Sequence, residues 1–127
     1  MKETFLHHLW KYRKFEGAAS SSKLKTVCGK ELQIVKTGIH NELAGPDFFN
    51  AQVRIDDQLW AGNVEVHIKS SDWYLHNHEQ DAAYENVILH VVWEDDCSVF
   101  DKADVAIPTL ILSDKVNKEL LNSYRQL

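Results

Sequence analysis

Polar and apolar side chains alternate without interruption over residues 63–69, and no other feature constrains the fold of this chain as strongly. Successive side chains of a β-strand point to opposite faces, so Glu65, His67 and Lys69 share one face and three apolar residues share the other. A carboxylate, an imidazole and an ammonium in one row can hold a divalent metal ion and activate a water molecule. The alternative is a solvated surface, because one face of an antiparallel sheet commonly meets water.

This strand is expected to belong to a hairpin. Residues 48–55 also alternate, turn residues follow at 56–58, and residues 59–69 return as the partner strand. The apolar face of the earlier strand would consist of Phe49, Ala51, Val53 and Ile55.

The remaining elements follow from periodicity, caps and turn residues. Thr4 is the expected cap of a first helix, and Ser113 or Asp114 the cap of a last helix. Between them the sequence predicts a Ser-rich loop at 17–22, a strand at 31–39 and helical turns at 76–86 that Asp81 caps. A buried strand at 87–93 and an edge strand at 105–112, placed at the edge by Pro108, follow. The apolar faces of the two helices would be Phe5, Leu6, Leu9 and Trp10, and Val116, Leu120, Leu121 and Tyr124.

The order of these elements is helix, three-stranded antiparallel meander, helix and buried strand. That order is typical of an α+β (mixed α/β) protein. At this length, residues 1–127 are expected to form a single domain with a real core.

Charge is divided unevenly along the chain. The 127 residues carry a formal net charge of -5, with Lys and Arg in excess up to residue 36 and Asp and Glu in excess after it. The basic end can lie along a phosphate backbone or belong to a solvated helix, and the acidic remainder argues against broad, unassisted nucleic-acid binding. No apolar run is long enough to cross a bilayer, and Cys28 and Cys97 have no metal-type spacing. We therefore expect a cytoplasmic protein with reduced thiols and no membrane partner, and nothing in the sequence fixes an oligomeric state.

Asp47 and Glu65 supply the oxygen ligands that Mg²⁺ prefers. Lys69 or His67 can orient a water molecule and offset charge on a phosphate. Asp47, however, is an even number of residues away from the apolar residues of its strand, so in a regular strand its side chain would point to the apolar face. It meets Glu65 only if it lies outside the regular pleat or if a bulge re-aims it.

Histidines form a second candidate metal set, because zinc accepts imidazole. His76, His78 and Asp81 are close in sequence, and His67 lies on the preceding strand. These residues lack an HxxxH or CxxC spacing, so a polar surface loop is the alternative. His90 lies inside an apolar strand and is expected to be a hydrogen-bonded core residue.

Tryptophans can serve binding or packing. Trp60, Trp73 and Trp93 can stack on bases or sugars, or they can close the edges of a small core. The sequence contains no Gly-rich phosphate loop, nucleophile elbow or heptad repeat, which excludes those classes.

Three motifs carry a family resemblance: GPDFFNA at 45–51, WAGNVEVHIKSSDW at 60–73 and NVILHVV at 86–92. They resemble an uncharacterised bacterial family, domain of unknown function 2851, over about residues 32–112. The resemblance to this family implies no particular activity. Its members are longer, so the resemblance leaves open whether residues 1–127 are the N-terminal part of a longer protein or a short member.

The order of elements is also remotely similar to the core of the PD-(D/E)XK nuclease superfamily. In that superfamily Pro-Asp begins the second strand and Asp/Glu-x-Lys follows in the third. Pro46, Asp47 and Glu65 match, but His67 stands where the lysine is expected, and Lys69 is two residues further on. The resemblance implies a restriction-endonuclease-like core and metal-dependent phosphodiester cleavage.

The leading hypothesis is therefore a Mg²⁺-dependent, nuclease-like phosphodiesterase acting on DNA or RNA. Asp47 and Glu65 would bind the metal, and His76, His78 and Trp73 would lie beside the substrate. One alternative is a non-catalytic binding or scaffold module. The other is a zinc-dependent hydrolase or zinc-stabilised domain.

Overall fold

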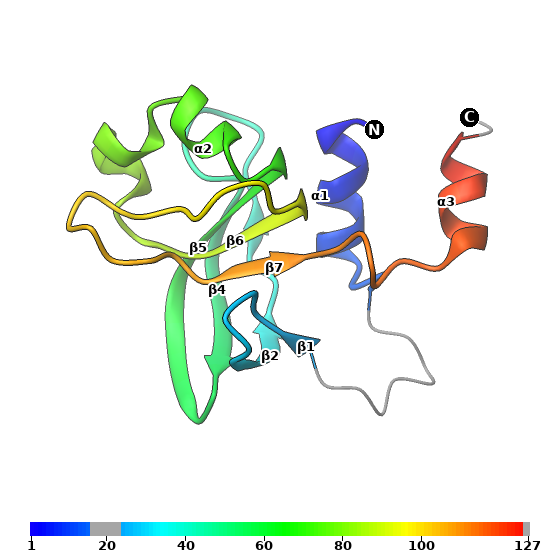
Figure 1. Ribbon diagram of the computed structural model, residues 1–127, viewed down its shortest axis with the longest axis horizontal. Helices are drawn as coiled ribbons and strands as arrows, with labels where there is room; N and C mark the ends of the chain where they lie inside the picture. Colours follow the sequence, from blue (N-terminus) through cyan, green and yellow to red (C-terminus); the bar gives the residue numbers. More distant parts are fainter. Residues whose placement is uncertain (16–23, 126–127) are drawn as a thin grey trace.

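The computed structural model describes residues 1–15 and 24–125, which form one curved mixed sheet with two helices in its hollow (Figure 1). The expected α+β class is confirmed. The Ser-rich loop expected at 17–22 lies outside the described residues. The elements are α1 (Glu3–Lys11), β1 (Leu24–Lys25), β2 (Glu31–Lys36), β3 (Ile39–His40), β4 (Phe48–Ile55), β5 (Gln58–Lys69), α2 (Asp72–Leu75), the 3₁₀ turns η1 (His78–Gln80) and η2 (Ala82–Tyr84), β6 (Val87–Glu94), β7 (Thr109–Ile111) and α3 (Lys118–Arg125).

The sheet has the strand order β1-β2-β4-β5-β6-β7, with β3 beside β4. The expected meander is present, because β4 runs antiparallel to both of its neighbours, β2 and β5. β6 is parallel to both β5 and β7, and the connection from β5 to β6 runs through α2 and the two 3₁₀ turns. The Val27 N–H donates to the Thr109 carbonyl (2.9 Å), which ties the end of β1 to β7 and nearly closes the sheet.

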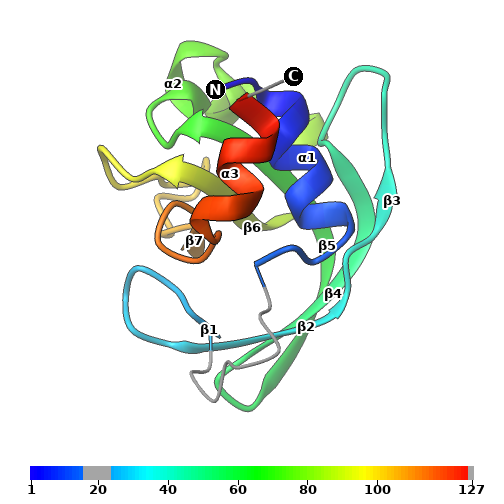
Figure 2. The same cartoon turned by 90° about the vertical axis from the view of Figure 1, so that its right-hand side faces the viewer.

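The main core lies between the inner face of the sheet and α1 and α3, which run side by side in Figure 2. The apolar faces predicted for both helices are confirmed, and the Phe5 and Tyr124 rings stack with their centroids 3.9 Å apart. Full burial of a large apolar side chain contributes about 1.5–3 kcal/mol, so this face holds α1 in place. The sheet supplies Leu32, Ile34, Phe48, Ala51, Val53, Ile55, Val64, Val66, Leu89, Val91 and Leu110.

Both helix caps differ from the predicted ones. Lys2, and not Thr4, is the N-cap of α1, and its side chain makes no capping hydrogen bond. At α3 the Asn117 Oδ1 accepts the Leu120 N–H (2.7 Å), so the cap lies three residues beyond Asp114. In each case the predicted residue has the right chemistry, but the helix begins elsewhere.

Three other predicted elements are shorter than expected. Residues 76–86 form η1 and η2 instead of a regular helix, although Asp81 caps η2 by accepting the Ala83 N–H (2.9 Å). The strand expected at 31–39 ends at Lys36, and the strand expected at 105–112 is reduced to β7. β7 does lie at the end of the strand order, in agreement with the edge position predicted from Pro108.

A β-bulge in β4 changes which side chains face the core. Phe48 is paired with Val64 and Ala51 with Gly62, so β4 has one extra residue between these two pairs. Asn50 takes up the bulge with a positive φ of 57°, a conformation that asparagine tolerates better than most residues. Phe48 is fully buried as a result, and the prediction that Phe49 would continue the apolar face is wrong.

Gly62 allows β5 and β6 to approach closely. A Cβ atom on Gly62 would lie 2.5 Å from Ile88 Cγ2 and 2.7 Å from the Asn86 carbonyl oxygen. We expect Gly62→Ala to destabilise the fold by about 1–3 kcal/mol, because the backbone of β6 must shift. Urea unfolding measures the effect. The exposed neighbour serves as control: Ala61→Ser should stay within about 0.5 kcal/mol, and equal stability of the two variants would contradict the close approach.

Candidate functional site

Glu65 and His67, on the polar face of β5, are buried, so the alternative of a solvated surface is wrong for these two residues. Glu65 is 3% exposed and His67 is 2% exposed. β5 lies between β4 and β6, and Glu65 is the register partner of His90 on β6. The segment from α2 to η2 packs over this face, where Trp73 contacts the ring of His90 (centroids 5.4 Å apart).

Asp47 and Glu65 form a carboxyl pair. Because of the bulge, Phe48 is the partner of Val64, and Asp47 therefore stands opposite Glu65 on the same face of the antiparallel ladder. The Asp47 Oδ2 accepts the Val66 N–H (2.8 Å), which fixes its position directly before β4. The two acidic groups that are far apart in the sequence thus meet, and the bulge considered from the sequence is the device that brings them together.

The carboxyl pair holds one negative charge in a setting that is poor in water. Burial and then the neighbouring Asp47 raise the pKa of Glu65 far above its ordinary value. Burial also acts to raise the pKa of Asp47, but hydrogen bonding with His7 and with Glu65 outweighs it, and the pKa of Asp47 is lowered. At neutral pH the charge therefore lies on Asp47 and a proton on Glu65.

His7 of α1 lies beside Asp47 of the carboxyl pair. Its Nε2 lies 3.5 Å from the Asp47 Oδ1, and its Nδ1 lies 3.2 Å from the His40 Nε2. Burial acts to lower the pKa of His7, but Asp47 outweighs it, and the pKa is raised. Glu3, one helical turn earlier, lies near enough to interact electrostatically with Asp47, and burial and then Asp47 raise its pKa.

His67, His76 and His78 form a histidine trio on the inner side of the pair. One ring nitrogen from each lies within 4.8 Å of the others. The His78 Nε2 is 2.8 Å from the Glu65 Oε2, and the His67 Nε2 is 3.8 Å from the same oxygen. Three imidazoles thus converge on a small volume, and the Glu65 Oε2 lies beside two of them.

The local backbone explains how two neighbouring histidines reach His67. α2 is a single helical turn, and Asn77 follows it with a positive φ of 55°. Asparagine tolerates this left-handed conformation, which lets the chain reverse within one residue. His76 and His78, on either side of Asn77, then lie with ring centroids 5.3 Å apart.

A buried hydrogen bond fixes the ring of His67. Its Nδ1 lies 2.7 Å from the His90 Nε2, which confirms the prediction that His90 is hydrogen-bonded in the core. Burial and then the neighbouring imidazole of His90 lower the pKa of His67 to about 2. Burial and then His78 lower the pKa of His90 to about 3. Both rings stay neutral, the form in which imidazole binds metal ions.

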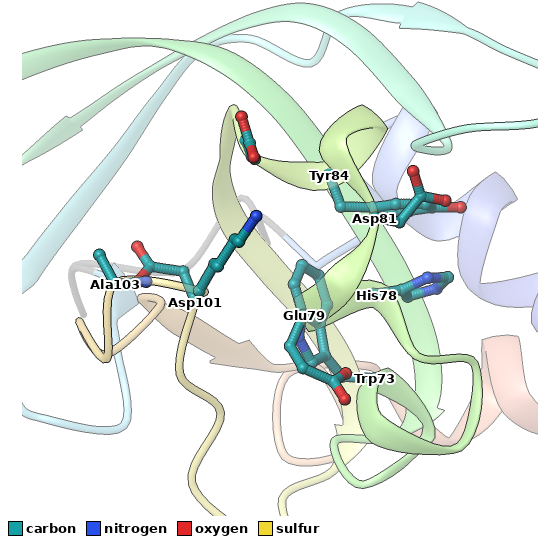
Figure 3. Close-up of a pocket in the computed structure, with 9 residues that line it drawn as sticks. Trp73, His78, Glu79, Asp81, Tyr84, Asp101 and Ala103 are labelled. Atoms are coloured by element: carbon teal, nitrogen blue, oxygen red, sulfur yellow. The ribbon is translucent and has the colours of Figure 1, made fainter.

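A cavity of about 330 Å³ opens beside the trio (Figure 3). His78 forms part of its wall and stacks on Tyr84, with ring centroids 3.7 Å apart. Trp73 is 1% exposed and packs in a second, smaller core with Val99 and Ile107, so it lines the cavity as a fixed wall. The other lining residues are mostly acidic: Glu79, Asp81, Glu85, Asp101, Lys102 and Ala103.

The residues present fit a transition metal better than Mg²⁺. Imidazole suits Zn²⁺ and the other late first-row metals, whereas Mg²⁺ favours oxygen ligands. The Glu65 Oε2 faces two of these imidazoles, so one carboxyl oxygen lies beside the nitrogen donors.

The structure brings most of the predicted site residues together, but not all of them. Lys69 lies at the exposed end of β5, and its backbone N–H binds the Asp72 side chain. Asp81 caps η2, and the group of residues that can share one metal ion does not include it. His7 and His40 were not predicted, and no local pattern indicates them, because α1 and β3 meet the pair only in the fold.

Comparisons with curated proteins and with solved structures find no match. In the part of the chain that the structure describes, no helix is long and apolar enough to cross a membrane. A family model, described as Protein of unknown function (DUF2851), matches residues 3–127. The motifs around Asp47, Glu65 and His90 lie inside this match, so the chain is a member of the DUF2851 family.

Proposed function

We propose that this domain is a metal-dependent hydrolase whose metal ion is held by the histidine trio and Glu65. The observation that carries the proposal is the convergence of three ring nitrogens within 4.8 Å, beside a buried carboxyl oxygen. Burial lowers the pKa values of His67 and His78, so these two rings bind Zn²⁺ or Mn²⁺ without first losing a proton. The ion, when bound, would supply an activated water molecule.

The carboxyl pair beside this centre can bind and release protons. In the metal-free protein Glu65 and Asp47 have pKa values driven in opposite directions, and perturbed pairs of this kind are typical of functional sites. Asp47 carries the charge and can accept a proton from the water molecule. The adjoining cavity, with Trp73 and Tyr84 in its wall, offers room for a small substrate group.

Removing one exposed member of the trio tests the proposal. His76 is exposed, so His76→Ala should change the free energy of unfolding by no more than about 0.5 kcal/mol. The same variant should weaken Zn²⁺ or Mn²⁺ binding by at least about 10–100-fold, because a ligand is lost. Calorimetric titration of the metal-free protein measures the affinity, and hydrolysis of bis(p-nitrophenyl) phosphate measures turnover.

His8→Ala is the matched control, since it also removes one exposed histidine, from α1. It should leave metal affinity and turnover unchanged. Equal affinity of His76→Ala and the wild type would exclude the trio as the site. Metal binding without turnover on phosphoesters, carboxylic esters or nucleic acid would instead support a metal-stabilised binding module.

A Mg²⁺-dependent nuclease is the second candidate, favoured by the position of Asp47 opposite Glu65. This arrangement is what the PD-(D/E)XK resemblance implies for the first two acidic positions, with a restriction-endonuclease-like core around them. His67 would take the place of the lysine, since Lys69 is exposed at the strand end. The acidic cavity wall is unfavourable for a polyanion approaching from that side. Cleavage of DNA or RNA with Mg²⁺, retained in His76→Ala and lost in Asp47→Asn, would select this candidate.

A further inference from the structure

We propose that the site holds two metal ions, bridged by the Glu65 carboxyl group, with the second ion bound by His7 and Asp47. This inference rests on the proposed metal centre at the trio and adds a second position on the other side of Glu65. No sequence pattern pointed to it, because His7 lies on α1 and Asp47 directly before β4.

The spacing of the donors fits an ion between them. Two ligands each about 2.1 Å from one ion at the tetrahedral angle are about 3.4 Å apart. The His7 Nε2 and the Asp47 Oδ1 are 3.5 Å apart, somewhat long for a simple hydrogen bond. The His7 Nε2 has no nearer partner than this oxygen in the described part of the chain.

The two oxygens of Glu65 have different surroundings. Oε2 faces the trio, 2.8 Å from the His78 Nε2. Oε1 accepts no N–H within the described ranges, on a side chain that is 3% exposed and hydrogen-bonded with Asp47. A carboxylate that gives one oxygen to each of two ions would satisfy both, and two-metal hydrolytic sites place their ions about 3.5–4 Å apart.

Each position has the same supporting arrangement around one histidine. On the trio side, the His67 Nδ1 is bonded to the His90 Nε2 and its Nε2 faces Glu65. On the other side, the His7 Nδ1 is bonded to the His40 Nε2 and its Nε2 faces Asp47. A bond at one ring nitrogen that orients the other toward a metal is the usual outer support of a metal-binding histidine. The repetition of this arrangement is the main reason to assign two positions and not one.

The acidic side chains supply the charge that two ions require. Asp47, Glu65 and Glu3 gather at this end of the sheet, and Glu3 interacts electrostatically with both Asp47 and His7. Two divalent ions would offset the like charges of the carboxyl groups gathered there.

Mn²⁺ binding to the whole chain tests the inference. Elemental analysis should give two ions per chain for the wild type, and the electron paramagnetic resonance spectrum should show the closely spaced lines of a spin-coupled pair. Asp47→Asn and, separately, His7→Ala should each reduce the content to one ion and restore the six-line spectrum of an isolated ion. His76→Ala should instead weaken the trio position. Asp57→Asn, in the exposed turn between β4 and β5, is the matched carboxylate control and should keep two ions.

The outcomes separate the two proposals. One ion per chain in the wild type, with an isolated-ion spectrum that Asp47→Asn does not change, overturns the second position and leaves the trio centre standing. His7 and Asp47 would then be an ion pair and nothing more. Absence of bound Mn²⁺ and Zn²⁺ from the folded wild type overturns both. Circular dichroism of each variant checks that a lost ion does not reflect a lost fold.

Discussion

Glu65→Gln is expected to make the metal-free protein more stable while it abolishes tight metal binding. The folded pKa of Glu65 is raised far above the ordinary 4.5 by burial and then by Asp47. A group of this kind stabilises the fold fully below pH 4.5, and that contribution is lost as pH rises toward the folded pKa, at about 1.4 kcal/mol per pH unit. Glutamine has a similar shape and does not ionise, so it removes this loss. The gain at neutral pH is up to about 3 kcal/mol.

The same substitution removes the oxygen that faces the trio. A neutral amide is a weak metal ligand, so we expect the affinity for Zn²⁺ or Mn²⁺ to fall by at least about 100-fold. This is more than the roughly 10–100-fold loss that is typical when a residue hydrogen-bonded to a metal ligand is removed. Urea unfolding in a chelator measures the first effect, and calorimetric metal titration the second. Asp57→Asn, an exposed acid in the turn, should change neither.

Opposite signs of the two effects would indicate a residue kept for binding at the expense of stability. A Glu65→Gln protein that is less stable without metal, yet binds metal as the wild type does, would show that the buried acid is a structural hydrogen-bonding group. Both measurements are needed, because a loss of affinity alone can follow from a damaged fold.

The strands that frame the site could be predicted because their signal is local. Alternation over residues 63–69 fixes which side chains of β5 share a face, and the apolar run of β6 fixes a central position in the sheet. The register that makes Glu65 the partner of His90 is not contained in these patterns and comes from the fold. They do not say whether the polar face meets water or protein, because burial depends on where the segment from α2 to η2 packs.

The parts of the site that could not be predicted depend on single residues in unusual backbone conformations or on distant contacts. The extra residue that Asn50 takes up in β4 reverses the parity that seemed to exclude Asp47. Asn77 brings its two neighbouring histidines together by the same left-handed conformation. Asparagine is enriched in the left-handed conformation but is also common in other conformations, so the presence of asparagine in the sequence does not predict either turn. His7 reaches the pair only because α1 packs in the hollow of the sheet.

Acid is expected to destabilise the metal-free protein below pH 6.5, the ordinary pKa of histidine. Burial, and then neighbouring imidazoles, lower the pKa of His67 to about 2 and that of His90 to about 3. Groups with a lowered folded pKa contribute stability above pH 6.5, and it is lost as pH falls toward the folded values, because the unfolded chain binds protons first. Two such groups give a slope of about 2.7 kcal/mol per pH unit. As pH falls from 6.5 to 4.5, protonation of Glu65 opposes this loss of stability by about 1.4 kcal/mol per pH unit.

A double variant can isolate this slope without breaking the hydrogen bond. His67→Asn places an amide near the Nδ1 position and His90→Gln places one near the Nε2 position, the two atoms that are 2.7 Å apart. Urea unfolding across a series of pH values should show the acid loss in the wild type and in the control His8→Ala. In the double variant the loss should be much smaller, because only His78 then keeps a lowered pKa, while the raised pKa values of Glu65, Glu3 and His7 oppose its effect. An unchanged acid slope in the double variant would place the sensitive groups elsewhere, and the two rings could not be the neutral pair that keeps the metal site ready to bind.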